Sequence, residues 1–220
     1  MSLPAPPERS DRRFGEALAR HGLVAILRST RGTRLPEVIS VLAGAGVRLI
    51  EVTVRTPGCL AALRETGDRL PAGVYLGAGT VTTLEEVEAV RAAGGTFTVS
   101  PHCDPEQVRA ARDARLAALP GAMTPTEILT AWRAGATAVK VFPAARAGGP
   151  SYTADVHATL PEIPLVPTGG IGAGQIAAYR AAGAVAVGVG SPLLGDALDG
   201  GSLTELASRA RDFVAAAAAR

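Results

Sequence analysis

Short apolar runs alternate with helical stretches along almost the whole chain, and this alternation is the strongest constraint on its fold. Each run is rich in Val, Ile and Leu, ends in a turn, and is followed by a stretch rich in Ala, Glu and Arg. Alternating strands and helices predict right-handed βαβ crossovers and a parallel sheet. The eight runs begin, 19 to 26 residues apart, at Val24, Arg48, Val74, Phe97, Leu116, Ala138, Pro164 and Ala184.

The number of runs predicts the architecture. Eight parallel strands favour an α/β fold of the (β/α)8 TIM-barrel type over an open doubly wound sheet, which stays the alternative. The spacing leaves no room for a second domain, so a single domain over residues 1–220 is predicted. Residues 1–10 are predicted to be a flexible leader, residues 11–21 an extra N-terminal helix, and the Ala-rich stretch ending at Arg220 a final outer helix.

Capping patterns mark the starts of three helices. Asp104 is followed by a proline and then by Glu106 and Gln107, which is an N-cap, a favoured first helical residue and a capping partner in order. Thr124 with Glu127, and Thr83 with Glu86, have the spacing of a capping box.

Composition excludes several classes of function. The net charge is +2 and the acids and bases are interspersed, which argues against a nucleic-acid partner. No stretch of 18 apolar residues and no apolar leader occurs, so neither a membrane span nor a signal peptide is predicted. The two cysteines, Cys59 and Cys103, are expected to stay reduced, as in the cytoplasm. The histidines at positions 21, 102 and 157 lack metal-ligand spacing, so no metal is expected.

A single lysine stands inside an apolar strand. Of 22 basic residues, 21 are arginines, and the exception is Lys140 in the run from Ala138 to Phe142. Burial disfavours the charged form of a lysine, whereas arginine keeps its proton. A free amine attacks a ketone or aldehyde to form an imine. Lys140 is therefore predicted to be a Schiff-base nucleophile, the alternative being a structural cation that extends its ammonium to solvent or pairs with an acid.

The run from Arg48 supplies polar partners for that lysine. Side chains alternate between the faces of a strand, so Glu51, Thr53 and Arg55 are predicted to face the interior, opposite an aliphatic set. The same parity places Lys140 and Phe142 on one face. Barrel enzymes hold their catalytic groups at the carboxyl ends of the strands. The alternative is a buried Glu51–Lys140 ion pair that only fixes the fold.

Glycine-bearing turns follow the last two strands. Thr168-Gly169-Gly170 and Gly190-Ser191 present backbone N–H groups, which bind anions well, at the usual phosphate site of this fold. Glycines also serve tight turns for geometric reasons alone. The run Gly77-Ala78-Gly79-Thr80 has Thr82 where a third glycine would complete a dinucleotide-binding motif, so that function is rejected.

Six motifs in order resemble the 2-keto-3-deoxy-6-phosphogluconate (KDPG) aldolases. This family also includes 4-hydroxy-2-oxoglutarate aldolases and 6-phosphogalactonate relatives. The resemblance runs from about Val24 to Leu194, and its motifs are EVTVRT from Glu51, GAGTV from Gly77, SP from Ser100, LPG from Leu119, VKVFPA from Val139 and PTGGI from Pro167.

The resemblance implies a (β/α)8 barrel, a homotrimer and roles for individual residues. Lys140 matches the Schiff-base lysine and Glu51 the general acid/base. Further substrate contacts are expected from Phe142, which shares the lysine's face, and from Arg28, which would join Arg55 at the substrate carboxylate. The remaining matches are Arg55, Thr80 and Pro101 at the pyruvate end, and Thr168, Gly169, Gly170, Gly190 and Ser191 at the phosphate end.

These residues together predict a class I aldolase that needs no cofactor. The predicted reaction cleaves KDPG, a phosphorylated 2-keto acid, to pyruvate and glyceraldehyde 3-phosphate; 4-hydroxy-2-oxoglutarate and the phosphogalactonate epimer are alternative substrates. The segment His102–Asp104 and Arg146 depart from the family pattern and leave that choice open. A phosphosugar isomerase or epimerase, or a metabolite sensor on the same barrel, are the rival functions; neither requires the lysine.

Overall fold

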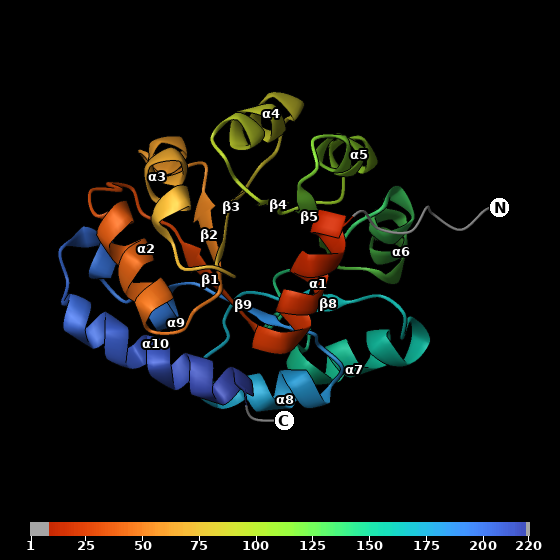
Figure 1. Ribbon diagram of the computed structural model, residues 1–220. Helices are drawn as coiled ribbons and strands as arrows, with labels where there is room; N and C mark the ends of the chain where they lie inside the picture. The colour runs from red at the N-terminus through yellow and green to blue at the C-terminus, as the bar shows by residue number, and fades with distance from the viewer. Residues whose placement is uncertain (1–8, 219–220) are drawn as a thin grey trace.

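The computed structural model describes residues 9–218 and has an α/β fold. In Figure 1 the strands lie in the centre, most of the helices are arranged around them, and helix α1 (Arg9–His21) crosses over one end. Each of the eight predicted runs contains a strand, which confirms the alternation. The strands are β1 (Leu23–Leu27), β2 (Leu49–Thr53), β3 (Tyr75–Gly79), β4 (Phe97–Val99), β5 (Ala117–Leu119), β6 (Gly121–Ala122), β7 (Val139–Val141), β8 (Leu165–Pro167) and β9 (Val187–Val189).

All paired strands are parallel, as predicted, and they form two sheets. One sheet has the order β5-β4-β3-β2-β1-β9 and the other has the order β6-β7-β8. The fifth run divides into β5 and β6 at Pro120, whose nitrogen has no hydrogen to donate to a neighbouring strand. The Pro120 carbonyl still accepts a 2.9 Å hydrogen bond from the Lys140 backbone nitrogen. Isolated bridges Leu165↔Ala184 and Thr168↔Gly188 join the segments of β8 and β9.

Along the chain, the remaining helices follow the strands, as the alternation predicts. Helix α1 begins at Arg9, within the expected leader; residues 1–8 of that leader, and residues 219–220, lie outside the described part of the chain. The other helices are α2 (Leu35–Gly44), α3 (Cys59–Thr66), α4 (Leu84–Ala92), α5 (Pro105–Asp113), α6 (Pro125–Ala134), α7 (Gly149–Thr159), α8 (Ile176–Ala181), α9 (Ser191–Leu194) and α10 (Leu203–Ala218), with 3-10 turns η1 (Gly67–Arg69), η2 (Ala173–Gln175) and η3 (Ala197–Asp199).

The predicted caps are present at three helix starts. Asp104 accepts hydrogen bonds from the backbone nitrogens of Glu106 and Gln107, and Thr124 and Glu127 form a reciprocal capping box. Thr83 caps α4 by accepting from the Glu86 nitrogen. The box is incomplete there, because the Glu86 carboxylate accepts from the backbone nitrogen of residue 82, at 2.6 Å, rather than from that of Thr83.

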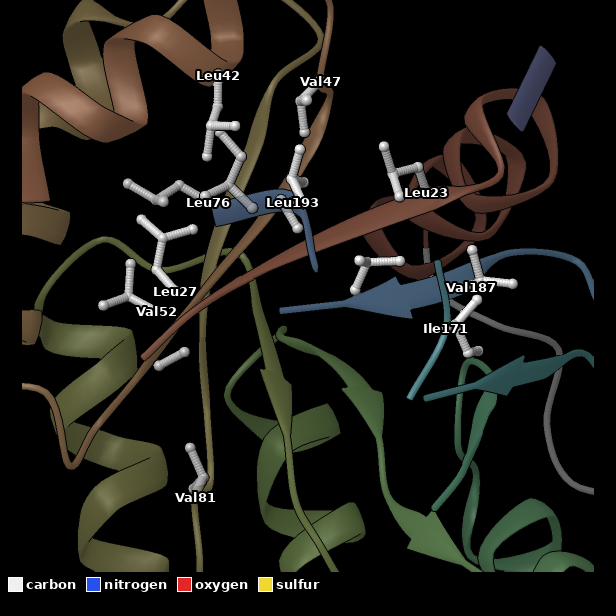
Figure 2. Close-up of a cluster of buried hydrophobic side chains, with 14 of the residues drawn as sticks. Leu23, Leu27, Leu42, Val47, Val52, Leu76, Val81, Ile171, Val187 and Leu193 are labelled. Carbon is white, nitrogen blue, oxygen red and sulfur yellow. The ribbon is translucent and has the colours of Figure 1, made fainter. Parts of the chain in front are cut away.

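Apolar side chains form two separate layers. The larger cluster lies between the strands and the surrounding helices, and Figure 2 shows part of it, in which Leu27, Val52 and Leu76 from the strands belong to one cluster with Leu42 of α2. The smaller cluster contains the opposite faces of the strands, including Val24, and is completed by α1 side chains. An apolar layer on both faces of the strands is what a sheet buried on both sides requires. The members of the smaller cluster are Phe14, Ala17, Leu18, Val24, Leu49, Phe97, Val99, Ala117, Leu119, Ala138, Val166 and Ala186.

The described residues contain neither a candidate membrane span nor a candidate metal-binding cluster. Within residues 9–218 there is no helix long and apolar enough to cross a membrane. The same part of the chain holds no group of three or more His, Cys, Asp or Glu side chains that could bind a metal ion.

Candidate active site

The carboxyl ends of the strands surround a cavity of about 450 Å³. Strand ends and the loops that follow them contribute its walls, as expected for a parallel α/β fold. Eleven of the twelve residues predicted for the site line this cavity, and Arg55 is the exception. The eleven are Arg28, Glu51, Thr80, Pro101, Lys140, Phe142, Thr168, Gly169, Gly170, Gly190 and Ser191.

Lys140 lies at the centre of β7 and extends into the cavity. Its neighbours in register are Gly121 on one side and Val166 on the other, so the backbone is held from both directions. The residue is only 8% exposed, and its Nζ lies 5.2 Å from the centroid of the Phe142 ring. The ring and the amine therefore share a face, as the strand parity predicts.

Glu51 lies on β2 and is 2% exposed. Its carboxylate occupies the space above Gly79 on β3: a Cβ atom at position 79 would come within 1.6 Å of Glu51 Oε1. Gly79, which the sequence singled out in the GAGTV motif but not as a site residue, is thus required to accommodate the acid. Burial raises the pKa of Glu51, and the positive charge of Lys140 opposes that shift without cancelling it.

Glu51 and Lys140 face the same two spaces. Both line the large cavity and also a smaller inner space of about 10 Å³. Among the ion pairs within residues 9–218, none joins these two side chains at 4.0 Å or less. A closed Glu51–Lys140 ion pair is therefore not present, and both side chains line the cavity.

Arg55 lies outside the lining of the cavity, contrary to the strand-parity expectation. Strand β2 ends at Thr53, and the Thr56 nitrogen donates to the Thr53 carbonyl at 2.8 Å, so the chain turns before Arg55 and the alternation of faces stops. The Arg55 side chain is 61% exposed and pairs with Glu86 at 3.2 Å. It also donates to Thr82 Oγ1 at 3.0 Å.

Thr80 follows β3 and has an uncommon backbone conformation. Its φ is 56°, in the left-handed region that β-branched residues rarely adopt. The flanking backbone is held by two hydrogen bonds, from Val54 to the Gly79 carbonyl at 2.8 Å and from Val81 to the Val99 carbonyl at 3.0 Å. Such conformations concentrate at functional sites, where the surrounding structure maintains them.

The turn after β8 has the features of an anion site. Gly169 and Gly170 have φ values of 99° and 76°, which favour glycine. Within the described part of the chain their backbone nitrogens donate to no acceptor, whereas the Gly169 carbonyl accepts from Ala145 at 3.2 Å. Free N–H groups of successive residues form a concave surface that binds anions. Gly190 and Ser191 face the same cavity from the end of β9.

Several lining residues were not predicted for the site. Thr53 was expected to face the interior, and Gly188 has the strand parity of Gly190, so both were within reach of sequence reasoning. Asp199, in η3, had no signal in the sequence. The full set is Ile26, Thr53, Ile171, Gly188, Pro192, Leu194, Gly195, Leu198 and Asp199.

A family model and relatives by sequence place the chain in one family. The family model described as "KDPG and KHG aldolase" matches residues 15–207. The protein named "Probable 2-dehydro-3-deoxy-6-phosphogalactonate aldolase" of Rhizobium meliloti (strain 1021) is 34% identical over 186 residues, covering 84% of this chain and 87% of that protein. A 2-dehydro-3-deoxy-phosphogluconate aldolase of Pseudomonas aeruginosa is 33% identical over 159 residues, covering 72% of each chain.

A solved structure extends the likeness to three dimensions. It is a KDPG aldolase from Legionella pneumophila, with pyruvate captured at low pH as a covalent carbinolamine intermediate. The TM-score is 0.81 at 26% identity, and the match covers 90% of this chain and 96% of that one.

Proposed function

The chain belongs to the KDPG and KHG aldolase family of class I carbon–carbon lyases, and on that premise we propose that it releases pyruvate from a phosphorylated 2-keto acid through a Schiff base at Lys140. One observation carries the assignment: the only lysine of the chain is 8% exposed and lines the cavity together with Glu51. An arginine would supply a structural cation equally well, so the amine itself is the group required.

The proposed reaction begins at the ketone carbon of the substrate. The unprotonated Lys140 amine attacks C2, and loss of water leaves an iminium ion. Removal of the proton from the C4 hydroxyl then breaks the C3–C4 bond. The electron pair of that bond moves into the iminium, so an aldehyde leaves and an enamine of pyruvate stays on the lysine. Protonation at C3 and hydrolysis release pyruvate and restore the amine. The iminium is the electron sink, so this sequence requires no metal or organic cofactor.

Glu51 is proposed to move the protons in these steps. Its carboxylate faces the same space as Lys140, and burial raises its pKa toward the working pH, where a group both accepts and donates protons efficiently. Its position above Gly79 fixes the direction from which it approaches the substrate.

The anionic groups of the substrate are proposed to bind at separate places. Arg28 is the one arginine among the lining residues, and its guanidinium suits a carboxylate or phosphate. The free backbone N–H groups of Gly169 and Gly170, with Gly190 and Ser191, are proposed to hold the phosphate. Thr80 and Pro101 line the pyruvate end, and Arg55 could join them only by leaving Glu86.

Among the candidate substrates we propose KDPG. The relatives of nearly equal identity act, by name, on the gluconate and galactonate epimers, and the family name adds 4-hydroxy-2-oxoglutarate. Stereochemistry at C4 depends on small differences in pocket geometry. Measuring pyruvate release from all three keto acids will rank them by kcat/KM. Faster release from the galactonate epimer would make that epimer, and not KDPG, the preferred substrate.

Trapping tests the Schiff base directly. Borohydride in the presence of pyruvate should add one reduced pyruvate to the chain, and peptide mass spectrometry should place it on Lys140. The matched control is Lys140→Arg, which keeps the charge but forms no imine. An unmodified wild-type chain, or an adduct elsewhere, would remove Lys140 from this role.

We propose further that the two sheets close into one (β/α)8 barrel that forms a single domain. The support is that only Pro120 separates β5 from β6, and that the Val185 nitrogen donates to the Leu165 carbonyl at 3.0 Å across the gap between β8 and β9. Hydrogen exchange tests closure: the amide of Val185 should exchange as slowly as those within β1 and β2. Fast exchange at that seam would favour an open sheet.

The assembly and its compartment are proposed from the same family membership. A homotrimer is expected, without nucleic-acid or membrane partners, and sedimentation equilibrium will give the mass. A cytoplasmic location fits the two free cysteines. Burial, with the charge of Glu51, raises the pKa of the Cys59 thiol to about 12, so this thiol is poorly reactive. Cell fractionation tests the location.

A further inference from the structure

The cavity has a second acidic side chain, Asp199, which the mechanism above does not use. Glu51 and Asp199 are the two acids among the lining residues, and Arg28 and Lys140 are the two cations. Glu51 is buried beside the lysine, whereas Asp199 is exposed in the 3-10 turn η3 that follows α9. The second acid therefore belongs to the outer part of the cavity, away from the bond that is cleaved.

One oxygen of Asp199 is held in a fixed direction. Ser29 Oγ donates to Asp199 Oδ1 at 2.8 Å. The same Oγ accepts from the backbone nitrogens of Arg31 and Gly32 at 2.9 and 3.2 Å, so both of its lone pairs are used and its hydrogen is left for the carboxylate. Ser29 is 8% exposed, and its own nitrogen donates to Thr56 Oγ1 at 3.2 Å. This network orients the acid on the cavity wall.

The second oxygen of Asp199 remains available to a ligand. In the described part of the chain, Ser29 makes the one hydrogen bond to this carboxylate, and no ion pair joins it to Arg28. An ionised carboxylate only accepts hydrogen bonds, so its partner must be a donor. A phosphate or carboxylate of the substrate would be repelled, whereas a hydroxyl would bind. The aldehyde half of a phosphorylated six-carbon keto acid carries such a hydroxyl, on the carbon next to the phosphate ester.

We propose that Asp199 is a specificity-determining residue that accepts a hydrogen bond from this hydroxyl of the aldehyde half. The inference rests on the proposed aldolase function and names one group that the site recognises. Ser29 is a positioning residue in this account, because it acts on the substrate only through Asp199.

A purely structural role for Asp199 makes a different prediction. The Ser29–Asp199 bond connects the end of η3 to the loop after β1, and Arg34 makes a second connection to this segment by donating to the Gly201 carbonyl at 3.0 Å. If Asp199 only held this segment, its removal would affect all substrates alike. A hydroxyl contact would instead be lost only for substrates that carry the hydroxyl.

The experiment measures aldol synthesis from pyruvate with two aldehydes, D-glyceraldehyde 3-phosphate and its 2-deoxy analogue, 3-oxopropyl phosphate. The wild-type chain should favour the hydroxylated aldehyde by roughly ten- to hundredfold in kcat/KM, the range for a hydrogen bond to a charged group. Asp199→Ala should reduce this preference to within about threefold, by losing rate with the hydroxylated aldehyde alone. Asp199→Asn, which keeps an acceptor oxygen without the charge, should give an intermediate preference, and Ser29→Ala a smaller loss.

Controls separate this inference from the function on which it rests. Asp212→Ala removes an exposed acid from α10 and should leave the preference unchanged. Borohydride trapping of pyruvate should be equally efficient in Asp199→Ala and in the wild type, since the lysine is untouched. An unchanged preference in a variant that still traps pyruvate would overturn the role of Asp199 alone. Failure of the wild-type chain to trap pyruvate would overturn both proposals.

Discussion

The inner and outer ends of the cavity are built in different ways. At the inner end, Lys140 and Glu51 stand on strands β7 and β2 and are 8% and 2% exposed. At the outer end, Arg28, Ser191 and Asp199 are exposed and lie in a loop, at the start of α9 and in the 3-10 turn η3, all of which follow strands. The inner groups are side chains in a fixed register, whereas glycine turns also contribute to the outer end.

This difference assigns two tasks to two kinds of structure. Charge that develops during a reaction is best stabilised by groups that are already oriented and shielded from water, which strands in register provide. Binding of a solvent-exposed phosphate needs donors that can approach closely, which glycine turns provide. Changes at the inner end should therefore lower kcat, and changes at the outer end should mainly raise KM.

The largest effect is expected at the amine. Lys140→Arg should lower turnover by roughly 10⁴-fold or more, because a guanidinium cannot form the imine. The fold should persist, since the new side chain keeps a cation near the Phe142 ring. Pyruvate release and circular dichroism measure the two properties. Appreciable turnover in a folded variant would show that the inner end does not act through this nitrogen.

The next effect tests how Glu51 is positioned. Gly79→Ala should slow turnover by about 10²- to 10⁴-fold, as Glu51→Gln should, because a Cβ atom at position 79 would displace the carboxylate. Pyruvate trapping should survive in both variants. The matched control is Gly67→Ala, whose Cβ atom meets no atom within 4 Å. A fully active Gly79→Ala enzyme would mean that Glu51 is free to act from another position.

Substituting either of the two arginines near the site should have a smaller effect, on KM, and the two variants should differ from each other. Arg28→Gln should raise KM by about 10- to 100-fold, because a charge-assisted contact is lost from the cavity. Arg55→Gln should raise it less, because Arg55 is paired with Glu86 outside the cavity. Steady-state kinetics will show which of the two variants has the larger increase in KM. The reverse order would show that Arg55 leaves Glu86 to bind the substrate.

At the glycine turn we expect KM to rise about tenfold, and only with phosphorylated substrates. Gly170→Ala would place a Cβ atom 2.9 Å from that of Ala145, at a φ of 76° that favours glycine, and should disturb the free N–H groups. The control is Gly174→Ala in the following 3-10 turn η2, with nothing within 4 Å of its Cβ atom. An equal loss with 4-hydroxy-2-oxoglutarate, which has no phosphate, would contradict the assignment.

The smallest expected effect is on stability. The folded chain raises the pKa of Glu51 above its ordinary value of 4.5, so the folded state binds this proton more tightly than the unfolded state does. The stabilisation that results is fully present below about pH 4.5 and is lost as the pH rises through the folded-state pKa. Glu51→Gln removes this dependence. Relative to the variant, the wild-type free energy of unfolding should fall between pH 4 and neutrality. If the free energies of unfolding of the two proteins change with pH in parallel, the pKa of Glu51 is not raised by folding.

The sequence predicts most of the residues that line the inner end of the cavity and fewer of those that line the outer end. The parity of two strands placed Glu51, Lys140 and Phe142 on interior faces, because alternation of side chains is a property of the backbone of any strand. The glycine turns were found because a left-handed φ leaves a residue signature. Arg55 was misplaced because the same alternation was extended past the residue where β2 ends.

Sequence patterns alone predict the alternation of strands and helices and the faces of the strand residues, and they single out Lys140 as the candidate nucleophile. The packing of separate elements, by contrast, turns Arg55 away to Glu86 and places the Glu51 carboxylate above Gly79. It also brings Asp199 to a cavity that Lys140, 59 positions earlier in the chain, lines as well. The physical reason is that periodicity constrains residues within one element. Contacts between loops depend on how separate elements pack, and no local pattern records them.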